Sequence, residues 1–239
     1  MEVKIIAKIH NHYKTKFGIP RQSGLVNSAV STIVFEPEFR DINAFRGIEE
    51  YSHLWIIWRF SENEGKPWSP TVRPPRLGGN KRMGVFATRS PFRPNGLGLS
   101  VVELVKLEMT EEGPILHVKG ADMMDGTPIL DIKPYLPHME SIPEAKAGFA
   151  GVVAEANVEV EIAEHIRETI PEDVLGEFRE ILSQNPKPGY QKDDERIYGM
   201  EYGEYEIKFR YCDGMIRLLD IRVKNEEICN GTSINQRRH

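Results

Sequence analysis

The chain is poor in cysteine, which excludes two ways of stabilising a small protein. It contains only Cys212 and Cys229, so it can form neither a disulfide framework nor a four-thiolate zinc site. Its histidines are spread along the chain, with only His10 and His12 close together, and no His-Glu-x-x-His pattern occurs. We therefore expect a reduced, cytoplasmic protein that binds no metal.

Long apolar runs are also missing. The most hydrophobic stretch, Leu54-Trp55-Ile56-Ile57-Trp58, has five residues, whereas a membrane helix needs about 20. The start, Met1-Glu2-Val3-Lys4, carries an acidic residue, and the apolar run after it is too short for a signal peptide. These patterns predict a soluble chain without a membrane segment.

Glycine motifs that bind nucleotides are absent too. Neither Gly-x-Gly-x-x-Gly nor a Walker A loop occurs, so the sequence gives no support for a Rossmann or P-loop site. An overall excess of basic residues is also lacking, since 31 Lys and Arg stand against 36 Asp and Glu, for a net charge of −5. Any contact with nucleic acid must therefore use a local basic patch.

Short apolar and β-branched runs fill the first part of the chain. Strands are predicted near residues 3–9, 32–35, 54–58, 99–107 and 115–119, with a turn at Gly113-Pro114. A short helix is predicted over 42–50, capped by Asp41 and weakened by Gly47. Many short strands with Gly and Pro between them are typical of an antiparallel sheet or barrel.

The composition changes after Pro137. Residues 141–183 contain ten acidic and three basic side chains, and a helix that Pro171 opens has an apolar stripe. We interpret the acids as a solvated helix face. A hairpin follows, with its turn at Asp213-Gly214. These patterns predict a mainly β domain over 1–138, a smaller α+β domain over 139–223 and a flexible tail over 224–239.

The segment from Lys66 to Arg93 is locally basic. It has no acidic residue and is rich in Pro and Gly, which indicates a shaped loop; its basic residues are Lys66, Arg73, Arg76, Lys81, Arg82, Arg89 and Arg93. Such a loop suits an anionic partner, either nucleic-acid phosphates or the acidic groups of a cofactor. From charge alone, a solubilising loop paired with acidic helices is an equal alternative.

Three motif regions resemble a known family. They are Thr71 to Asn80, then Gly84 to Asn95 with its Arg-Ser-Pro-Phe-Arg-Pro-Asn run, and Asp125-Gly126-Thr127-Pro128 with the following Asp131 to Pro137. Together they are similar to the TsaA-like (TrmO) family, and Asn185 to Lys192 resembles a loop of its longer bacterial members. The resemblance implies a non-Rossmann β-barrel methyltransferase that uses S-adenosylmethionine. It also implies a homodimer that N6-methylates threonylcarbamoyladenosine at position 37, in the anticodon arm of tRNA.

The resemblance also implies site residues. Those for the cofactor are Pro20, Arg21, Gln22, Ser61, Glu62, Arg89, Leu99, Asp125, Gly126, Thr127 and Pro128. Those for tRNA, from the basic loop and the second domain, are Arg73, Arg76, Lys81, Arg82, Arg93, Tyr190 and Lys192. No general base is identified; Asp125 and Asn95 are the catalytic candidates, and we expect Asp125 to orient a cofactor group.

Two departures from the family pattern affect this site. Ser61-Glu62 stands where the family commonly has His-Gln, and Gly96-Leu97-Gly98 stands where it has Pro-Ile-Gly. Two alternative functions remain open from the sequence. One is a methyltransferase of the same fold that acts on another RNA or a small molecule. The other is a noncatalytic RNA-binding module.

Overall fold

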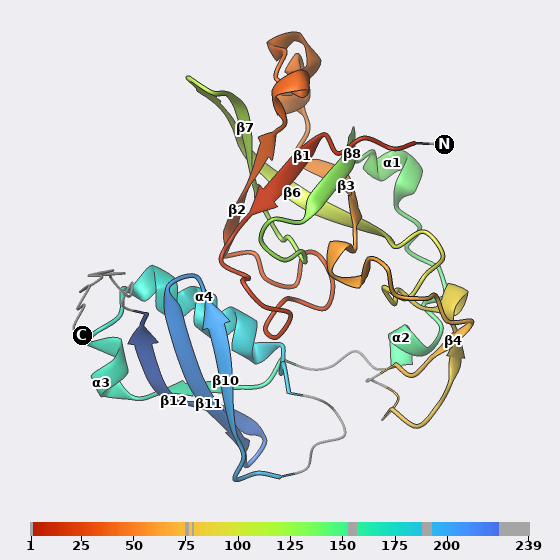
Figure 1. Cartoon of the computed structure of the whole chain (residues 1–239). Helices are drawn as coiled ribbons and strands as arrows, with labels where there is room; N and C mark the ends of the chain where they lie inside the picture. Colours follow the sequence, from red (N-terminus) through yellow and green to blue (C-terminus); the bar gives the residue numbers. More distant parts are fainter. Residues whose placement is uncertain (1, 75–76, 78, 153–156, 188–192, 225–239) are drawn as a thin grey trace, which may run out of the picture.

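A computed structural model of the chain describes residues 2–74, 77, 79–152, 157–187 and 193–224. It contains a closed barrel of six strands, a four-stranded sheet and a two-stranded sheet. Figure 1 shows the barrel above the four-stranded sheet, with the two-stranded sheet, marked by its label β4, at the lower right. The mainly β architecture predicted from the sequence is confirmed.

The barrel is closed entirely by antiparallel pairs, in the order β1-β2-β7-β6-β3-β8. Its strands are β1 (Ala7–His10), β2 (Val30–Phe35), β3 (His53–Arg59), β6 (Leu97–Thr110), β7 (Gly113–Lys119) and β8 (Pro128–Pro134). Parallel βαβ units, which build a Rossmann fold, are absent from this sheet. Closure leaves no strand edge unpaired.

Side-chain alternation explains the core of the barrel. In β3, Leu54, Ile56 and Trp58 point inward and are buried, while the residues between them are partly exposed. Leu116 and Val118 of β7 face the same interior. Successive side chains of a strand point to opposite faces, so a strand with one buried face shows apolar residues at every second position. This alternation in the sequence predicts these strands.

Short 3-10 turns and two small strands connect the barrel strands. The turns span Pro37–Phe39, Ile42–Phe45, Ile48–Glu50, Ser61–Asn63 and Val85–Ala87, and the small strands are β4 (Thr71–Val72) and β5 (Met83–Gly84). The single helix predicted over 42–50 is therefore wrong. Asp41 does cap the turn Ile42–Phe45. Gly47 has a φ of 85°, however, and this left-handed residue separates that turn from Ile48–Glu50.

The four-stranded sheet has the order β10-β11-β12-β9, and only its β12–β9 pair is parallel. The strands are β9 (Val160–Ile162), β10 (Ile197–Tyr202), β11 (Tyr205–Cys212) and β12 (Met215–Val223). The predicted hairpin is confirmed, with left-handed Asp213 and Gly214 at its turn. We call this sheet with its helices α3 (Glu164–Arg167) and α4 (Glu172–Ser183) the C-terminal unit.

The apolar stripe of α4 packs against this sheet. Leu175, Phe178, Ile181 and Leu182 are buried with the inner faces of β10, β11 and β12, which confirms the predicted helix. Two acids on this helix contradict the interpretation of a fully solvated face. The Tyr202 hydroxyl donates to Glu177 at 2.5 Å, and Glu180 accepts from the backbone amides of Asn27 and Ser28.

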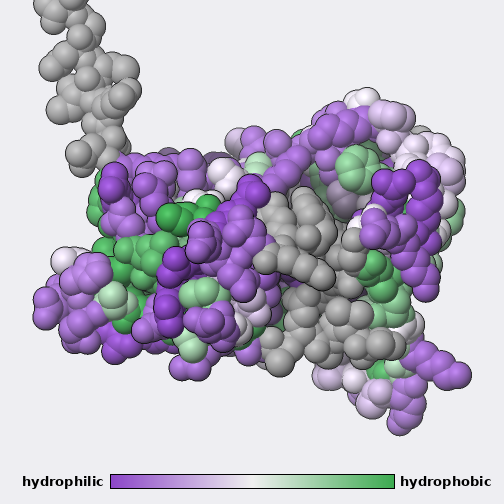
Figure 2. All heavy atoms as spheres, turned by 90° about the horizontal axis from the view of Figure 1, so that it is seen from below, coloured by the Kyte–Doolittle hydropathy of each residue, from purple (hydrophilic) through white to green (hydrophobic). Residues whose placement is uncertain are grey.

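Two further helices are short: α1 (Pro137–Glu140) and α2 (Phe149–Val152). Within the described ranges, no helix has the length and apolar character needed to cross a membrane. Figure 2 shows one face of the molecule, where hydrophilic side chains dominate and hydrophobic ones form groups between them. Cys212 is a buried free thiol.

Gly98 shows how tightly one end of the barrel is packed. It pairs with Trp58 across β6 and β3, and a Cβ at this position would lie 2.2 Å from Cε2 of the indole. We predict that Gly98→Ala lowers the free energy of unfolding by about 1–3 kcal/mol, because a buried indole cannot move away freely. Urea unfolding measures this change. The control is Gly199→Ala in β10, where no heavy atom lies within 4 Å of the new Cβ. Equal stability of the two variants would contradict the prediction.

Candidate functional site

A pocket of about 460 Å³ opens at the end of the barrel where β3 ends and β6 and β8 begin. Antiparallel neighbours bring the end of one strand and the start of the next to the same place. The walls come from the β1–β2 connection, from the turn after β3 and from the loops before β6 and β8. We call this cavity the barrel pocket.

Most residues that the sequence predicts for the cofactor line the barrel pocket. They are Pro20, Arg21, Gln22, Ser61, Glu62, Arg89, Leu99 and Thr127. The structure thus brings together residues from separate stretches of the chain. Asp125, Gly126 and Pro128 lie outside this lining, although they are adjacent to Thr127 in the sequence.

A buried chain of hydrogen bonds ends at a carboxylate in the barrel pocket. The Trp58 indole donates to the Ser100 hydroxyl at 2.9 Å, and that hydroxyl donates to Oδ1 of Asp122 at 2.5 Å. Trp58 and Ser100 are buried, so the chain fixes the carboxylate firmly. Burial raises the pKa of Asp122 above its ordinary value, against the opposing effects of the Ser100 hydrogen bond and the Arg89 charge.

Sequence reasoning missed these hydrogen bonds. A signal was present, because Asp122 is a lone acid in the apolar run Ala121-Asp122-Met123-Met124, directly before the Asp-Gly-Thr-Pro motif. A carboxylate with a perturbed pKa in a cavity is a typical functional group. Of the described residues that line the barrel pocket, Asp122 and Glu62 are the carboxylates.

Arginines define the outer wall of the barrel pocket. Arg89 donates to the side-chain oxygen of Gln22 at 2.5 Å, which joins two predicted cofactor residues from distant stretches. Arg93 lines the pocket and donates to the backbone oxygen of Thr88 at 2.7 Å, within its own loop. The role of Arg93 in binding tRNA stays a prediction, and the contact that the structure shows holds the loop in shape.

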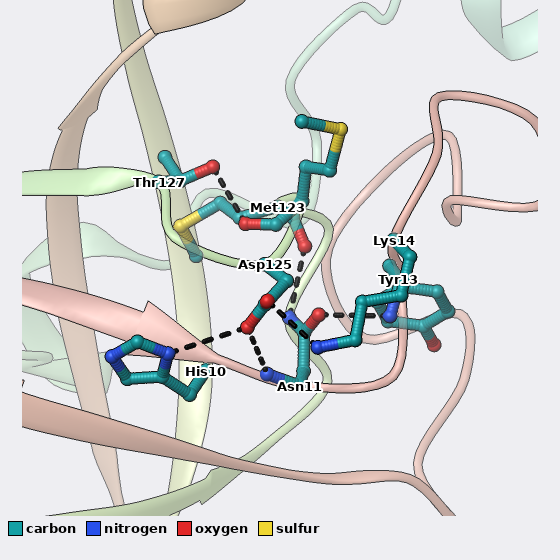
Figure 3. Close-up of polar contacts among 8 residues, drawn as sticks. His10, Asn11, Tyr13, Lys14, Met123, Asp125 and Thr127 are labelled. Carbon is teal, nitrogen blue, oxygen red and sulfur yellow. Dashed lines mark hydrogen bonds and ion pairs between the residues drawn. The ribbon is translucent and has the colours of Figure 1, made fainter. Parts of the chain in front are cut away.

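Asp125 is the centre of a separate polar cluster, which Figure 3 shows. Its carboxylate lies 2.7 Å from Lys14 Nζ and 3.3 Å from His10 Nδ1, and it accepts the Asn11 amide at 3.1 Å. Burial alone raises the pKa of Asp125, but the hydrogen bonds from Lys14 and Asn11 and the charges of Lys14 and His10 lower it overall. The cluster ties the end of β1 to the loop before β8, beside Thr127.

The loop before β6 carries one departure from the family pattern. Gly96 has a φ of 56°, a left-handed conformation that a proline, fixed near −65°, cannot adopt. This backbone path therefore excludes proline at position 96. Asn95, the other catalytic candidate, is exposed and lies outside the lining of the barrel pocket.

A second, larger cavity of about 1320 Å³ adjoins the barrel pocket. The two share Arg21, Gln22, Thr88, Arg89 and Pro91. Arg73, Arg82 and two exposed aromatic rings, Phe86 and Phe92, line the larger one. We call it the basic groove. Lys81 is exposed on the same loop; Arg76, Tyr190 and Lys192 lie outside the described residues.

No group of three or more His, Cys, Asp or Glu side chains able to hold a metal is found in the part of the chain that the structure describes. The fold and the two cavities define a class of protein: a non-Rossmann β-barrel with a pocket of small-ligand size beside a basic groove.

Comparisons with known proteins identify the family within this class. Residues 8–141 match the model of the tRNA-methyltransferase O N-terminal domain, and residues 153–224 match that of the TrmO C-terminal domain. The chain belongs to the tRNA-methyltransferase O family.

Two curated relatives and one solved structure illustrate the similarity. The tRNA (adenine(37)-N6)-methyltransferase of Escherichia coli is 42% identical, over 87% of this chain and 92% of its own. A putative S-adenosylmethionine-dependent methyltransferase, RcsF, of Pseudomonas aeruginosa is 38% identical over 92% and 96%. The crystal structure of a Pseudomonas TrmO matches with a TM-score of 0.75 and 32% identity, over 93% of this chain and 97% of the other.

The raised pKa of Asp122 has a measurable consequence for stability. Between the ordinary value of 3.8 and the raised value, the folded state binds this proton more tightly than the unfolded chain does. The free energy of unfolding therefore falls as the pH rises through that window. We predict that Asp122→Asn removes this part of the pH dependence, measured by urea unfolding across the acid range.

The control for this titration is Asp213→Asn, which changes a side chain that is 77% exposed. This variant controls for the loss of one carboxylate at the surface. If Asp122→Asn and Asp213→Asn give the same profile, the carboxyl of Asp122 titrates normally.

Proposed function

We propose that this chain is an S-adenosylmethionine-dependent methyltransferase that acts on N6 of the adenine at position 37 of tRNA. We further propose that the adenine carries a threonylcarbamoyl group, as the sequence resemblance implies. The observation that supports this function best is the pair of adjoining cavities, one of small-ligand size and one basic with exposed aromatic rings. The similarity to named tRNA (adenine(37)-N6)-methyltransferases gives the position of the methylated atom.

The residues of the barrel pocket fit the cofactor by their chemistry. The carboxylate of Glu62 suits the cationic and hydroxyl groups of S-adenosylmethionine, and the guanidinium groups of Arg21 and Arg89 suit its carboxylate. Leu99 offers an apolar surface, 53% exposed, for the adenine ring. A few polar groups in a partly apolar cavity are typical of a cofactor site.

When bound, S-adenosylmethionine would supply a sulfonium methyl group for transfer to the N6 nitrogen, with S-adenosylhomocysteine as the leaving group. The pocket contributes by positioning, because aligned reactants lower the barrier by up to about 7–11 kcal/mol. The N6 nitrogen carries a proton that must leave. We propose Asp122 as its acceptor, because the Ser100 hydroxyl, which the Trp58 indole holds in turn, fixes this carboxylate and burial favours its protonated form.

Asp125 has a different proposed role. Lys14, His10 and Asn11 already occupy its carboxylate oxygens, so we propose that it acts by positioning. In that role it orients the pocket wall at Thr127 and, through the wall, a group of the cofactor. Pro128 and Gly126 complete the same turn, and Asn95 stays a catalytic candidate on the loop before β6.

The basic groove is proposed as the binding surface for the anticodon arm. Arg73, Lys81 and Arg82 are on a loop without acids and suit phosphate groups. Phe86 is 75% exposed and Phe92 is 41% exposed. Aromatic rings beside arginines suit the unstacked bases of a single-stranded loop. Arg76, Arg93, Tyr190 and Lys192 extend this surface in the proposal.

We also propose a cytoplasmic homodimer, with a barrel domain over 1–138, a smaller domain over 139–223 and a tail over 224–239. The exposed Trp68, which lies outside the lining of the basic groove, offers apolar area that a second copy can cover in part. Sedimentation of the purified chain tests the dimer.

The function is tested with purified protein, S-adenosylmethionine and tRNA whose adenosine 37 carries the threonylcarbamoyl group. We predict that nucleoside mass spectrometry shows a gain of one methyl group on that nucleoside. Methylation of tRNA that lacks the threonylcarbamoyl group, or of another RNA, favours the alternative substrate. Calorimetry that detects no S-adenosylmethionine binding favours the noncatalytic RNA-binding module.

The basic groove gives a separate prediction. Arg73→Gln with Arg82→Gln should weaken tRNA binding and make the slope of log K against log salt shallower, by about one unit for each phosphate that the variant no longer binds. Binding of S-adenosylmethionine should stay unchanged. Filter binding across a salt series measures the slope. Arg46→Gln, an exposed arginine on the turn after β2, is the control. An equal loss of cofactor binding in the double variant would show that these arginines support the pocket itself.

A further inference from the structure

One segment of the barrel domain packs mainly with the C-terminal unit. Residues 11–29 connect β1 to β2, and we call them the bridging segment. Tyr13, Val26 and Ala29 of this segment are buried in the same hydrophobic cluster as Phe178 and Ile181 of α4. In Figure 1 the chain after β1 runs from the barrel toward α4 and its sheet. The middle of the segment, at residues 20–22, lines the barrel pocket.

Glu180 of α4 binds the second half of the bridging segment through its carboxylate. Oε1 accepts the Asn27 amide at 2.8 Å, and Oε2 accepts the Ser28 amide at 2.8 Å. The Ser28 hydroxyl also donates to Oε2. Hydrogen bonds to a charged acceptor are about twice as strong as neutral ones. One side chain of the C-terminal unit thus fixes two consecutive residues of the segment.

The first half of the bridging segment is fixed to the C-terminal unit by packing. Phe17 stacks on Phe209 of β11, with ring centroids 6.2 Å apart. Gly18 lies so close to β10 that a Cβ would be 2.3 Å from the Met200 sulfur, and its φ is 93°. A larger residue is therefore excluded at Gly18.

The pocket-lining residues lie between these two attachments. Arg21 donates to the backbone oxygen of Asn185, just after α4, at 3.0 Å. On the barrel side, Gln22 accepts from Arg89, and the Ser23 hydroxyl accepts the Val101 amide at 3.2 Å. The path of the chain over residues 20–22 therefore depends on the position of α4 as well as on the barrel.

We propose that the C-terminal unit holds the bridging segment in the conformation that binds the cofactor, and that Glu180 is a positioning residue for this binding. The inference rests on the proposed function, because it takes the barrel pocket as the S-adenosylmethionine site. Glu180 itself is outside the lining of that pocket and acts through Asn27, Ser28 and the loop before them. The C-terminal unit thereby supports the small-molecule site in addition to its proposed contact with tRNA.

Glu180→Gln in the full chain tests the proposal. The glutamine side chain keeps the size of the glutamate, but an NH2 group replaces one of the two acceptor oxygens. This NH2 group then faces the backbone N–H of Asn27 or Ser28, so one hydrogen bond is lost. We expect S-adenosylmethionine to bind about tenfold more weakly by calorimetry, within the usual range of coupling between two sites. The KM for the cofactor should rise similarly, while kcat at saturating cofactor stays within about twofold. A merely destabilised protein would not produce this split.

The matched control is Glu172→Gln on the same helix. The Glu172 side chain is 77% exposed, and its ion pair with Arg179 spans 3.7 Å. The affinity of the Glu172→Gln variant for S-adenosylmethionine should equal that of the parent chain. Ser28→Ala is a second, milder variant that removes the hydroxyl hydrogen bond to Glu180 and keeps the two amide bonds. It should weaken cofactor binding by a smaller factor without a change in melting temperature.

The outcomes separate this inference from the proposed function. Unchanged cofactor affinity in Glu180→Gln and Ser28→Ala, with normal binding by the parent chain, overturns the inference and leaves the function standing. Failure of the parent chain to bind S-adenosylmethionine overturns the proposed function. If Glu180→Gln does not fold, Ser28→Ala decides: weaker binding with an unchanged melting temperature supports the inference, and unchanged binding overturns it.

Discussion

The closure of the barrel between β1 and β8 is the constraint on which the site depends. This contact is short, with Ala7 opposite Ile129 and Lys8 opposite Pro128. Directly after it, the Asp125 cluster joins the end of β1 to the loop before β8. Because every other barrel pair is also antiparallel, the segments that carry Thr127, Asp122 and Leu99 converge at one end. Closure thus creates a pocket whose walls come largely from loops, where side chains can be varied without loss of the core.

Charge is distributed unevenly over this scaffold. The chain as a whole is acidic, yet the loop from Lys66 to Arg93 contains no acid. Acids of α4 that could have neutralised it are used elsewhere, since Glu177 binds Tyr202 and Glu180 binds the bridging segment. These two acids therefore do not neutralise Arg73 and Arg82 of the basic groove. A local basic field on an acidic protein favours specific over general binding of nucleic acid, because the remaining surface repels phosphates.

The sequence was sufficient for the elements whose pattern is local. Alternation in β3, the apolar stripe of α4 and the Asp213-Gly214 turn each follow from neighbouring residues, and the structure has all three. The sequence was insufficient where residues meet across the fold. Asp122 and Ser100 come from different strands and loops, so their hydrogen bond depends on strand register that no single segment encodes. Two nearby acids, Asp122 and Asp125, therefore face different surroundings, a pocket and a polar cluster.

The bridging segment explains why Glu180 departs from the interpretation of the acids of α4 as a solvated face. An amphipathic pattern shows which side of a helix is apolar, but it cannot show what covers the other side. In this fold a loop from the barrel covers part of it, because its Val26 and Ala29 need the same apolar cluster as Phe178. Once those side chains are buried there, the amides of Asn27 and Ser28 lie beside the helix, and Glu180 accepts a hydrogen bond from each. An acid that the sequence pattern assigns to solvent thus connects two halves of the molecule.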